Sequence, residues 1–259
     1  MNYKLFLHVM SILMIMPIVF GIYNSSNSEE PNYTNLNSNE KYLHNQLFES
    51  FSSEHKIDAI ISFKDKIDEP LLENNNIEIK ENIHSVHIST VTATMDNLKN
   101  LQNEANVEFI EPDLDLILLD TVSSDDESIN QIIPWGIEKV NAPNVWNITT
   151  GRNIKIAVLD SGINKFHLDL DDNIKGGISF INNTEYWDDD LGHGTSVAGV
   201  ISAKNNEFGV IGVAPDSKLY SIKIIDSSGG KLSNLIQGIQ WAIDNDIDII
   251  TMSLGIPVD

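Results

Sequence analysis

Two residues of the chain stand in surroundings that favour acid–base chemistry. His193 lies in the run GHGTSVAG of residues 192–199, and Asp160 ends an apolar run and precedes Ser161. A histidine between two glycines, followed by small and β-branched residues, indicates a side chain presented at the start of a tightly packed helix. An aspartate and a histidine set out in this way are two of the three parts of a nucleophilic hydrolase. The first question is therefore what would hold them together, and whether a nucleophile is present.

The region around these residues alternates between apolar strands and amphipathic helices. Near-continuous apolar strands separated by helices predict a parallel sheet covered on both faces. Asp160 would stand at the carboxyl end of its strand, where open α/β sheets place their sites. No Gly-x-Gly-x-x-Gly follows a strand, so a dinucleotide site is not expected. The expected strands are 154–160, 219–225 and 247–254, and the expected helices are 193–203 and 233–244, with Ser233 as the N-cap of the second.

A smaller module precedes this region. Strands are expected at 57–63, 83–88 and 107–113, with a helix at 94–101. These elements predict a small α+β domain over residues 54–119. Residues 120–130 are polar and acidic, which favours a domain boundary and a site of proteolytic cleavage.

The N-terminus resembles an export signal in outline. Lys4 precedes an apolar run that continues to Ile22, and residues 24–53 form a polar linker rich in Asn, Ser and Glu. The small-residue cleavage signal is poor and the apolar run approaches the length of a membrane span. Residues 1–23 are therefore expected to be a cleaved signal peptide, with a retained membrane anchor or a buried helix as alternatives. Only a retained segment would make the membrane a partner.

Composition limits the classes of partner. The formal net charge is −22, and because residues 131–259 hold 16 acidic and 9 basic residues, −15 of it lies in residues 1–130. Such a chain should be repelled by nucleic acid and by anionic membranes. The chain has no cysteine, which excludes a disulfide framework and a thiolate nucleophile and is compatible with export.

Five motifs give the chain a family resemblance: IPWGI at 133–137, AVLDSGI at 157–163, GHGT at 192–195, GVIGVAP at 209–215 and MSLG at 252–255. Residues 131–259 resemble the N-terminal half of a subtilisin-family (subtilase) serine protease, and residues 55–118 resemble the propeptide of that family. The resemblance implies a subtilisin-like, doubly wound parallel α/β sheet, partial at 131–259, preceded by an α+β domain that acts as intramolecular chaperone and inhibitor. It also implies a peptide or protein substrate and a bacterial protein that is secreted or held in the cell envelope.

The resemblance gives each catalytic residue a role. Asp160 would orient and charge-stabilise the imidazole, and His193 would be the general base. The nucleophilic serine should follow the histidine by roughly 155 residues, but 66 residues follow His193. The chain as given is therefore expected to be an inactive copy of a serine endopeptidase. Two alternatives are a propeptide-type inhibitor or binding module and a fragment without function, whose strand edge at 247–254 would make it poorly soluble.

One serine imitates the missing nucleophile. Ser196 lies in Gly-Thr-Ser-Val-Ala, which looks like the surroundings of the family's catalytic serine, but its position is that of the helix carrying the base. Packing or a local bond to the backbone is the expected role of its hydroxyl. The family usually has a second histidine at this position, and it usually has a proline where Leu168 stands. Neither departure removes a member of the triad.

Binding residues also follow from the resemblance. Gly229-Gly230 and Ser253-Leu254-Gly255 match the two backbone segments that bracket an extended substrate. A structural calcium ion is implied, because oxygen ligands around a surface loop suit Ca²⁺. The acidic run 188–190 could favour basic substrates, although a solvated loop is the preferred interpretation. The calcium ligands would be the side chains of Gln131, Asp169 and Asn206 and the carbonyl groups of Lys204, Phe208 and Val210.

Overall fold

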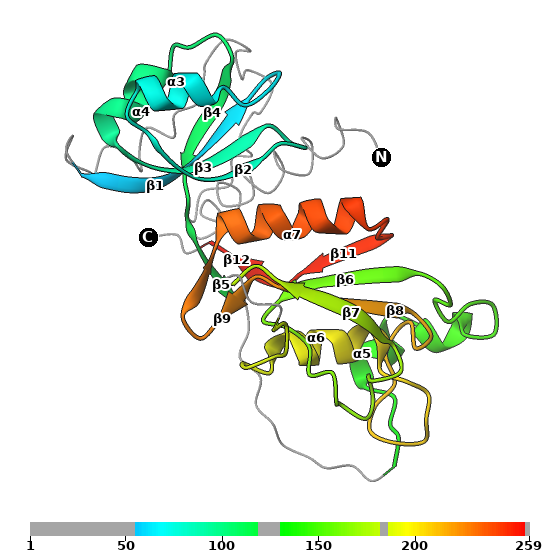
Figure 1. Cartoon of the computed structure of the whole chain (residues 1–259). Helices are drawn as coiled ribbons and strands as arrows, with labels where there is room; N and C mark the ends of the chain where they lie inside the picture. Colours follow the sequence, from blue (N-terminus) through cyan, green and yellow to red (C-terminus); the bar gives the residue numbers. More distant parts are fainter. Residues whose placement is uncertain (1–54, 119–129, 182–185, 257–259) are drawn as a thin grey trace, which may run out of the picture. The chain divides into compact units, whose positions relative to one another are not determined.

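The computed structural model describes residues 55–118, 130–181 and 186–256 (Figure 1). These residues divide into two compact units that meet in the sequence between Leu114 and Asp115. The expected signal or anchor at 1–23, the linker at 24–53 and all but the last residue of the linker at 120–130 lie outside the described residues. Within them, no helix combines the length and hydropathy that a bilayer crossing requires.

The first unit is a four-stranded antiparallel sheet with two helices on one face. The strand order is β2-β3-β1-β4. Alternate residues of β1, from Ile57 to Phe63, face Leu72 of α3 and Met95, Leu98 and Leu101 of α4 in one buried cluster. The elements are β1 Lys56–Phe63, α3 Glu69–Asn74, β2 Glu78–Ile83, β3 Ile88–Thr94, α4 Met95–Leu101 and β4 Val107–Pro112.

The expected strand at 83–88 is wrong. Strand β2 ends at Ile83 and β3 begins at Ile88, so the intervening residues form the turn of a hairpin. His87 adopts a positive φ of 58° there, which a strand does not allow. The alternation of residue types across a tight turn imitated a strand, while α3 and most of β2 went unrecognised because they are short and polar.

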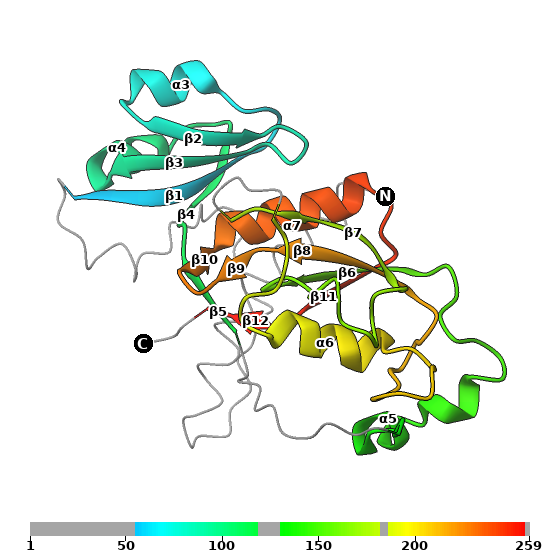
Figure 2. The ribbon, with the colours of Figure 1, turned by 60° about the horizontal axis from the view of Figure 1, so that its bottom comes forward.

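The second unit is built on a parallel sheet of order β11-β6-β8-β7. Helix α6 covers one face and α7 covers the other (Figures 1 and 2). On the α6 face, Ala198 packs with Ile156, Val158 and Leu219. On the α7 face the approach is close, since a Cβ atom on Gly238 would lie 3.1 Å from Ile222 and 3.2 Å from Leu159. The main elements are β6 Lys155–Asp160, β7 Ile174–Ser179, α6 His193–Ser202, β8 Lys218–Lys223, α7 Leu232–Asp244 and β11 Ile249–Met252, preceded by the short helices α5 Trp135–Lys139 and η2 Ala142–Val145.

A second, smaller sheet completes this unit. Its order is β12-β5-β10-β9, formed by Leu254–Gly255, Asp115–Leu118, Gly229–Lys231 and Ile225–Asp226 respectively. Strand β5 pairs antiparallel with both neighbours. Residues 115–118, which were expected in the first module, therefore pair inside the second unit.

The start of α7 also differs from expectation. The helix begins at Leu232 with Lys231 as N-cap, and Ser233 is buried in its first turn. The side chain of Asn234 accepts a hydrogen bond from the Lys231 amide at 2.8 Å. The capping hydrogen bond thus comes from the third helical residue rather than from a serine before the helix.

Candidate active site

Asp160 and His193 meet at the carboxyl end of the parallel sheet. Asp160 is the last residue of β6 and His193 is the first of α6. Their side chains lie 2.8 Å apart, from Nδ1 of the imidazole to Oδ1 of the carboxylate, and both are almost fully buried. The sequence placed these two residues at a strand end and a helix start, and the fold brings them into direct contact.

The partner of Nδ1 decides what the other ring nitrogen can do. An ionised carboxylate can only accept hydrogen bonds, so Nδ1 must carry a proton and donate a hydrogen bond to Asp160. In a neutral ring, Nε2 is then unprotonated and able to take a proton from a hydroxyl group. Burial raises the pKa of Asp160 above its ordinary value, and the hydrogen bonds from His193 and Ser161 oppose this effect. The arrangement is that of a general base with its orienting acid.

Two glycines let the helix start this close to the strand end. Gly192 has a positive φ of 80°, a conformation that glycine adopts without strain. A Cβ atom on Gly194 would lie 2.1 Å from the carbonyl oxygen of Gly162. Any larger residue at position 194 would push α6, and His193 with it, away from Asp160.

The acidic run before His193 is bound to the protein rather than simply solvated. Asp188 pairs with Lys165, Asp189 accepts hydrogen bonds from Ser161 and Thr195, and Asp190 pairs with Lys223. The buried Lys223 ammonium also donates to the carbonyl groups of Ser161 and Asp188, at 2.7 and 3.0 Å. This corrects the expectation of a solvated loop. Sequence reasoning missed the roles of Asp189 and Lys223, because the register that places Lys223 of β8 beside Asp160 of β6 exists only in the folded sheet.

The Ser196 hydroxyl behaves as expected for a false nucleophile. It donates to the backbone carbonyl of Gly192 at 2.9 Å. Among the described residues, the only side chain hydrogen-bonded to the His193 imidazole is Asp160. Among the described residues, therefore, no hydroxyl group is hydrogen-bonded to the His193 ring, where the nucleophile would be activated.

The two segments expected to bracket a substrate do flank an extended peptide. That peptide is β5 of the same chain: Leu116 pairs with Gly230, while Ile117 and Leu118 pair with Gly255 and Leu254. Leu116 is buried, with 3% exposure. Of the other two expected residues, Gly229 pairs with Asp226, and Ser253 lies between β11 and β12. Their assignment as substrate-binding residues remains a prediction.

The six expected calcium ligands lie around one loop. The Gln131 side-chain nitrogen lies 2.5 Å from the Lys204 carbonyl oxygen, 3.3 Å from Asn206 Oδ1, 3.2 Å from the Phe208 carbonyl and 3.1 Å from the Val210 carbonyl. An amide NH₂ group donates two hydrogen bonds, yet four oxygens converge on it.

Asp169 adds an unsatisfied carboxylate oxygen to this cluster. Its Oδ2 accepts from the Val210 amide at 2.9 Å, whereas its Oδ1 is buried without a partner among the described residues. An excess of oxygen ligands suits a hard cation. The described residues contain no cluster of three or more His, Cys, Asp or Glu able to hold a metal, so amide and carbonyl oxygens would supply most of the ligands.

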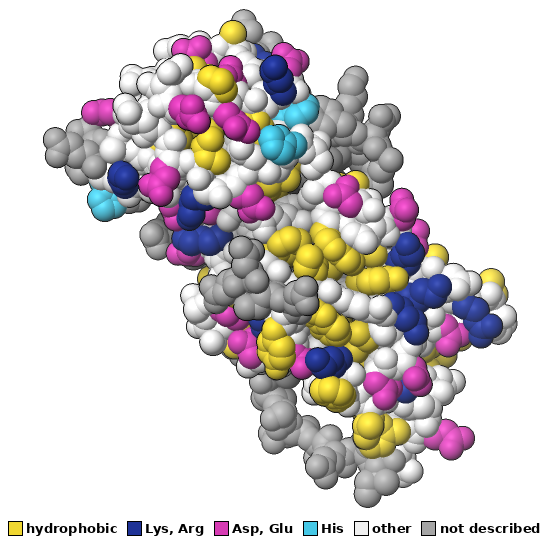
Figure 3. All heavy atoms as spheres, in the orientation of Figure 1, with side chains coloured by type: hydrophobic (Ala, Val, Ile, Leu, Met, Phe, Trp, Pro, Cys, Tyr) yellow, Lys and Arg dark blue, Asp and Glu magenta, His cyan; other side chains and the backbone are white. Residues whose placement is uncertain are grey.

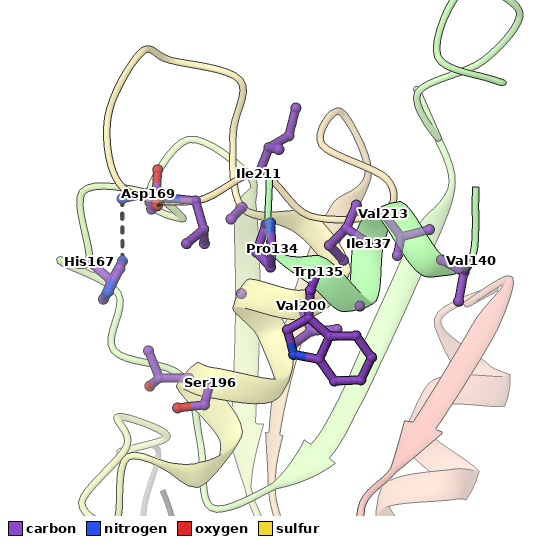
Figure 4. A pocket seen from close by; sticks show the side chains of 15 residues that line it. Pro134, Trp135, Ile137, Val140, His167, Asp169, Ser196, Val200, Ile211 and Val213 are labelled. Carbon is purple, nitrogen blue, oxygen red and sulfur yellow. Dashed lines mark hydrogen bonds between the residues drawn. The ribbon is translucent and has the colours of Figure 1, made fainter. Parts of the chain in front are cut away.

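An apolar pocket of about 580 Å³ lies beside α6 and does not include Asp160 or His193 (Figure 4). The Trp135 ring, Val200 and Val213 form its apolar part, and His167 lies at the other end with Asp169. His167 Nδ1 accepts from the Asp169 amide at 3.3 Å. The pocket is thus separate from the acid–base pair.

Comparisons with known proteins agree with this geometry. The sequence model of the Peptidase_S8 (subtilase) family matches residues 151–258. The Minor extracellular protease Epr of Bacillus subtilis is 34% identical over 215 residues, which are 80% of this chain and 33% of that protein. An alkaline protease of Alkalihalobacillus alcalophilus is 32% identical over 252 residues, 96% of this chain and 60% of that protein.

The fold has a counterpart among solved structures. Fervidolysin from Fervidobacterium pennivorans, a keratinolytic enzyme related to subtilisin, superposes with a TM-score of 0.63 at 22% identity, covering 78% of this chain and 36% of its own. The chain spans 60% or less of the length of each of these proteins. From the family match, the relatives and the Asp160–His193 geometry together, the second unit of this chain belongs to the subtilase family.

Proposed function

We propose that the chain supplies the acid and the base of a serine endopeptidase. The observation that carries this proposal is the buried 2.8 Å contact between His193 Nδ1 and Asp160 Oδ1. Asp160 holds the imidazole in one tautomer and stabilises the imidazolium, while His193 Nε2 takes the proton of a serine hydroxyl as that oxygen attacks the peptide carbonyl. The proton then passes to the leaving amine. The serine belongs to a segment beyond the described residues.

Fusion to a relative tests this proposal. Residues 1–256 would be joined to the part of the Bacillus subtilis protease that lies beyond its aligned region, and hydrolysis of a peptide substrate would be measured. His193→Ala and Asp160→Asn should each reduce kcat by several orders of magnitude, whereas Ser196→Ala should leave it unchanged. An active fusion that tolerates His193→Ala, or that Ser196→Ala inactivates, would contradict the proposal.

The unextended chain provides a second measurement that does not depend on the fusion. We expect it to take up no serine-directed fluorophosphonate, because no hydroxyl among the described residues is bonded to His193. Stoichiometric labelling of any residue would show that an activated serine is present.

The position of β5 favours a second candidate function, that of a propeptide-type inhibitor. Residues 55–114 form a unit of their own, and Leu114 leads directly into β5, which lies between Gly230 and Gly255 as an extended peptide would. The alignment with the alkaline protease covers 96% of the chain and so includes this unit. We infer that residues 54–119 are an intramolecular propeptide whose last strand occupies the substrate-binding segments.

Residues 55–118, made alone, should then inhibit the Bacillus subtilis relative at micromolar concentration. A variant with Leu116→Asp should inhibit much less, because a carboxylate would replace the buried leucine side chain. The matched control is Ile117→Asp, since Ile117 is 42% exposed. Absence of inhibition, or equal inhibition by both variants, would exclude this role.

Three further features belong to the same proposal. Calcium is the cation we expect at Gln131, Asp169 and the 204–210 loop, where it would tie the loop down and supply no step of the hydrolysis. A doubly wound sheet is supported by the helices on both faces of the parallel strands. Secretion is supported by the N-terminal sequence and by the extracellular location in the name of one relative.

A further inference from the structure

The helix that presents His193 is not capped by its own N-cap residue. Gly192 occupies that position and has no side chain to offer. The first backbone N–H groups of a helix have no partner within the helix and need one elsewhere. Here the Gly194 amide donates to Ser161 Oγ at 3.0 Å, and the Thr195 amide donates to Asp189 Oδ2 at 2.9 Å. Both acceptors lie outside the helix.

The Asp189 carboxylate accepts five hydrogen bonds. Its Oδ1 accepts from Ser161 Oγ at 2.7 Å and from the amides of Leu191 and Gly192 at 3.0 and 2.9 Å. Its Oδ2 accepts from the amide and the hydroxyl of Thr195, at 2.9 and 2.5 Å. This is more than the roughly four lone-pair sites of a carboxylate, so neither oxygen has accepting capacity to spare, and the group places a negative charge at the positive end of the helix dipole.

Ser161 joins this cap to the acid. Its backbone N–H donates to Asp160 Oδ1 at 2.7 Å, the same oxygen that faces His193. Its hydroxyl donates to Asp189 and accepts from Gly194. A closed circuit of hydrogen bonds therefore runs from the acid through Ser161 and Asp189 to the helix of the base, and back through the imidazole.

We propose that Asp189 is a positioning residue for the Asp160–His193 pair, and its catalytic meaning rests on the proposed function. Asp189 fixes the first turn of α6 against the end of β6, so that Nδ1 of the imidazole faces Oδ1 of Asp160. It makes no hydrogen bond to the imidazole and acts through the helix start and Ser161. With both oxygens occupied, it is not a determinant of preference for basic substrates.

The charge state agrees with this role. Burial would raise the pKa of Asp189, but the hydrogen bonds from Thr195, Ser161 and Leu191 outweigh it, and the pKa lies below its ordinary value. The group is therefore a carboxylate at neutral pH, as five donors require.

Nuclear magnetic resonance of the full chain tests the proposal without any measurement of hydrolysis. The readouts are the low-field resonance of the His193 Nδ1 proton, assigned with His193→Gln, and the hydrogen-exchange rates of the Leu191, Gly192 and Thr195 amides. Asp189→Asn replaces an acceptor by a donor within the circuit. Asp188→Asn is the matched control, because it removes the same charge one residue away and contacts Lys165 instead.

In Asp189→Asn the Nδ1 proton resonance should be lost or markedly shifted, and the three amides should exchange about tenfold faster or more. Asp188→Asn should keep both readouts at the values of the unmodified chain. Faster amide exchange with an unchanged Nδ1 resonance would make Asp189 a helix cap alone and overturn the proposal. Absence of the resonance from the unmodified chain would also overturn it.

Ser161→Ala carries the test if Asp189→Asn does not fold. It removes the bridging hydroxyl and leaves every charge and the Ser161 amide in place. The same loss of the Nδ1 resonance is expected, and an unchanged resonance would refute the circuit. Because none of these outcomes depends on turnover, an inactive fusion enzyme would count against the proposed function and not against this inference.

Discussion

Helix α6 of the second unit is capped by a different means from the two helices of the first unit. In the first unit the residue before each helix supplies the cap: Asp68 accepts from the Leu71 amide at 3.1 Å and Thr94 accepts from the Asn97 amide at 3.3 Å. In the second unit, α6 depends on Ser161, from a different element, and on Asp189. The first unit thus forms its helices by local rules, whereas α6 needs the sheet to be in place. The helix that is capped from outside is thus the one that must bring His193 to Asp160.

The two units also differ in the apolar side chains that they expose. All of the exposed large hydrophobic side chains among the described residues lie at Ile117 or beyond, in the second unit. On the face shown in Figure 3, the hydrophobic areas of the first unit are small and separated by charged and other polar groups, while those of the second unit form broader patches. Large exposed apolar patches mark surfaces that bind other protein. Both units have a buried apolar core, but among the residues described only the second also exposes large apolar side chains, which a partner could cover.

Truncation of one buried and one exposed side chain should show the largest difference. Leu98 is fully buried in the first unit, and Leu98→Ala should lower the free energy of unfolding by about 3–5 kcal/mol. Trp135 is 81% exposed in the second unit, and Trp135→Ala should cost less than about 0.5 kcal/mol. Urea denaturation followed by circular dichroism and hydrogen exchange measures both. Equal losses in the free energy of unfolding for the two variants would contradict the distinction between a buried core residue and an exposed surface residue.

The stability of the first unit should depend on pH through Glu111. Burial raises the pKa of this carboxyl from 4.5 to about 7. The folded state then binds more protons than the unfolded state between these values, so stability is highest below pH 4.5 and falls as the pH rises through 7. Glu111→Gln removes the buried charge and should stabilise the chain at pH 8 by at most about 3 kcal/mol, with little effect at pH 4.5.

Thermal melts at several pH values would measure this effect. The control is Glu73→Gln, because Glu73 is an exposed glutamate of α3 and should give the pH profile of the unmodified chain. A profile for Glu111→Gln that still falls between pH 5 and 7 would show that another group causes the dependence.

Calcium should stabilise the second unit and leave the first unchanged. At a free concentration one hundred times Kd, binding to the folded state alone adds about 2.7 kcal/mol. Asn206→Ala removes one expected ligand and should abolish most of the shift, while Asn147→Ala, at an exposed asparagine, should retain it. Calcium titrations followed by hydrogen exchange assign the effect to a unit. If calcium slowed amide exchange in residues 55–114 as much as in the second unit, a site on the 204–210 loop would be contradicted.

The sequence identified the elements of the acid–base pair because their signals are local. An apolar strand ending in Asp160 and a small-residue helix beginning at His193 are visible in short windows, and both were found within a residue or two. Strand β7 was missed because Gly176 and Gly177 interrupt its apolar pattern. The role of Asp189 was missed because its link to Ser161 spans 28 positions and only the folded sheet brings these two residues together, while its four other hydrogen bonds come from residues within six positions. Residues 115–118 gave no signal that they would leave the first module and pair with β10 and β12.

A smaller effect than that of calcium tests whether local capping is independent of the second unit. Thr94→Ala removes the side-chain acceptor of α4 and should cost about 1 kcal/mol, because one amide near the helix start loses its partner. The loss should accelerate hydrogen exchange in α4 and leave exchange in α6 unchanged, since no contact of Thr94 reaches that helix in the described bonds. Thr94→Ser keeps the hydroxyl and is the matched control, with most of the stability retained. If exchange in α6 rose together with that in α4, the two units would unfold as one, and the distinction between local and long-range capping would no longer separate their stabilities.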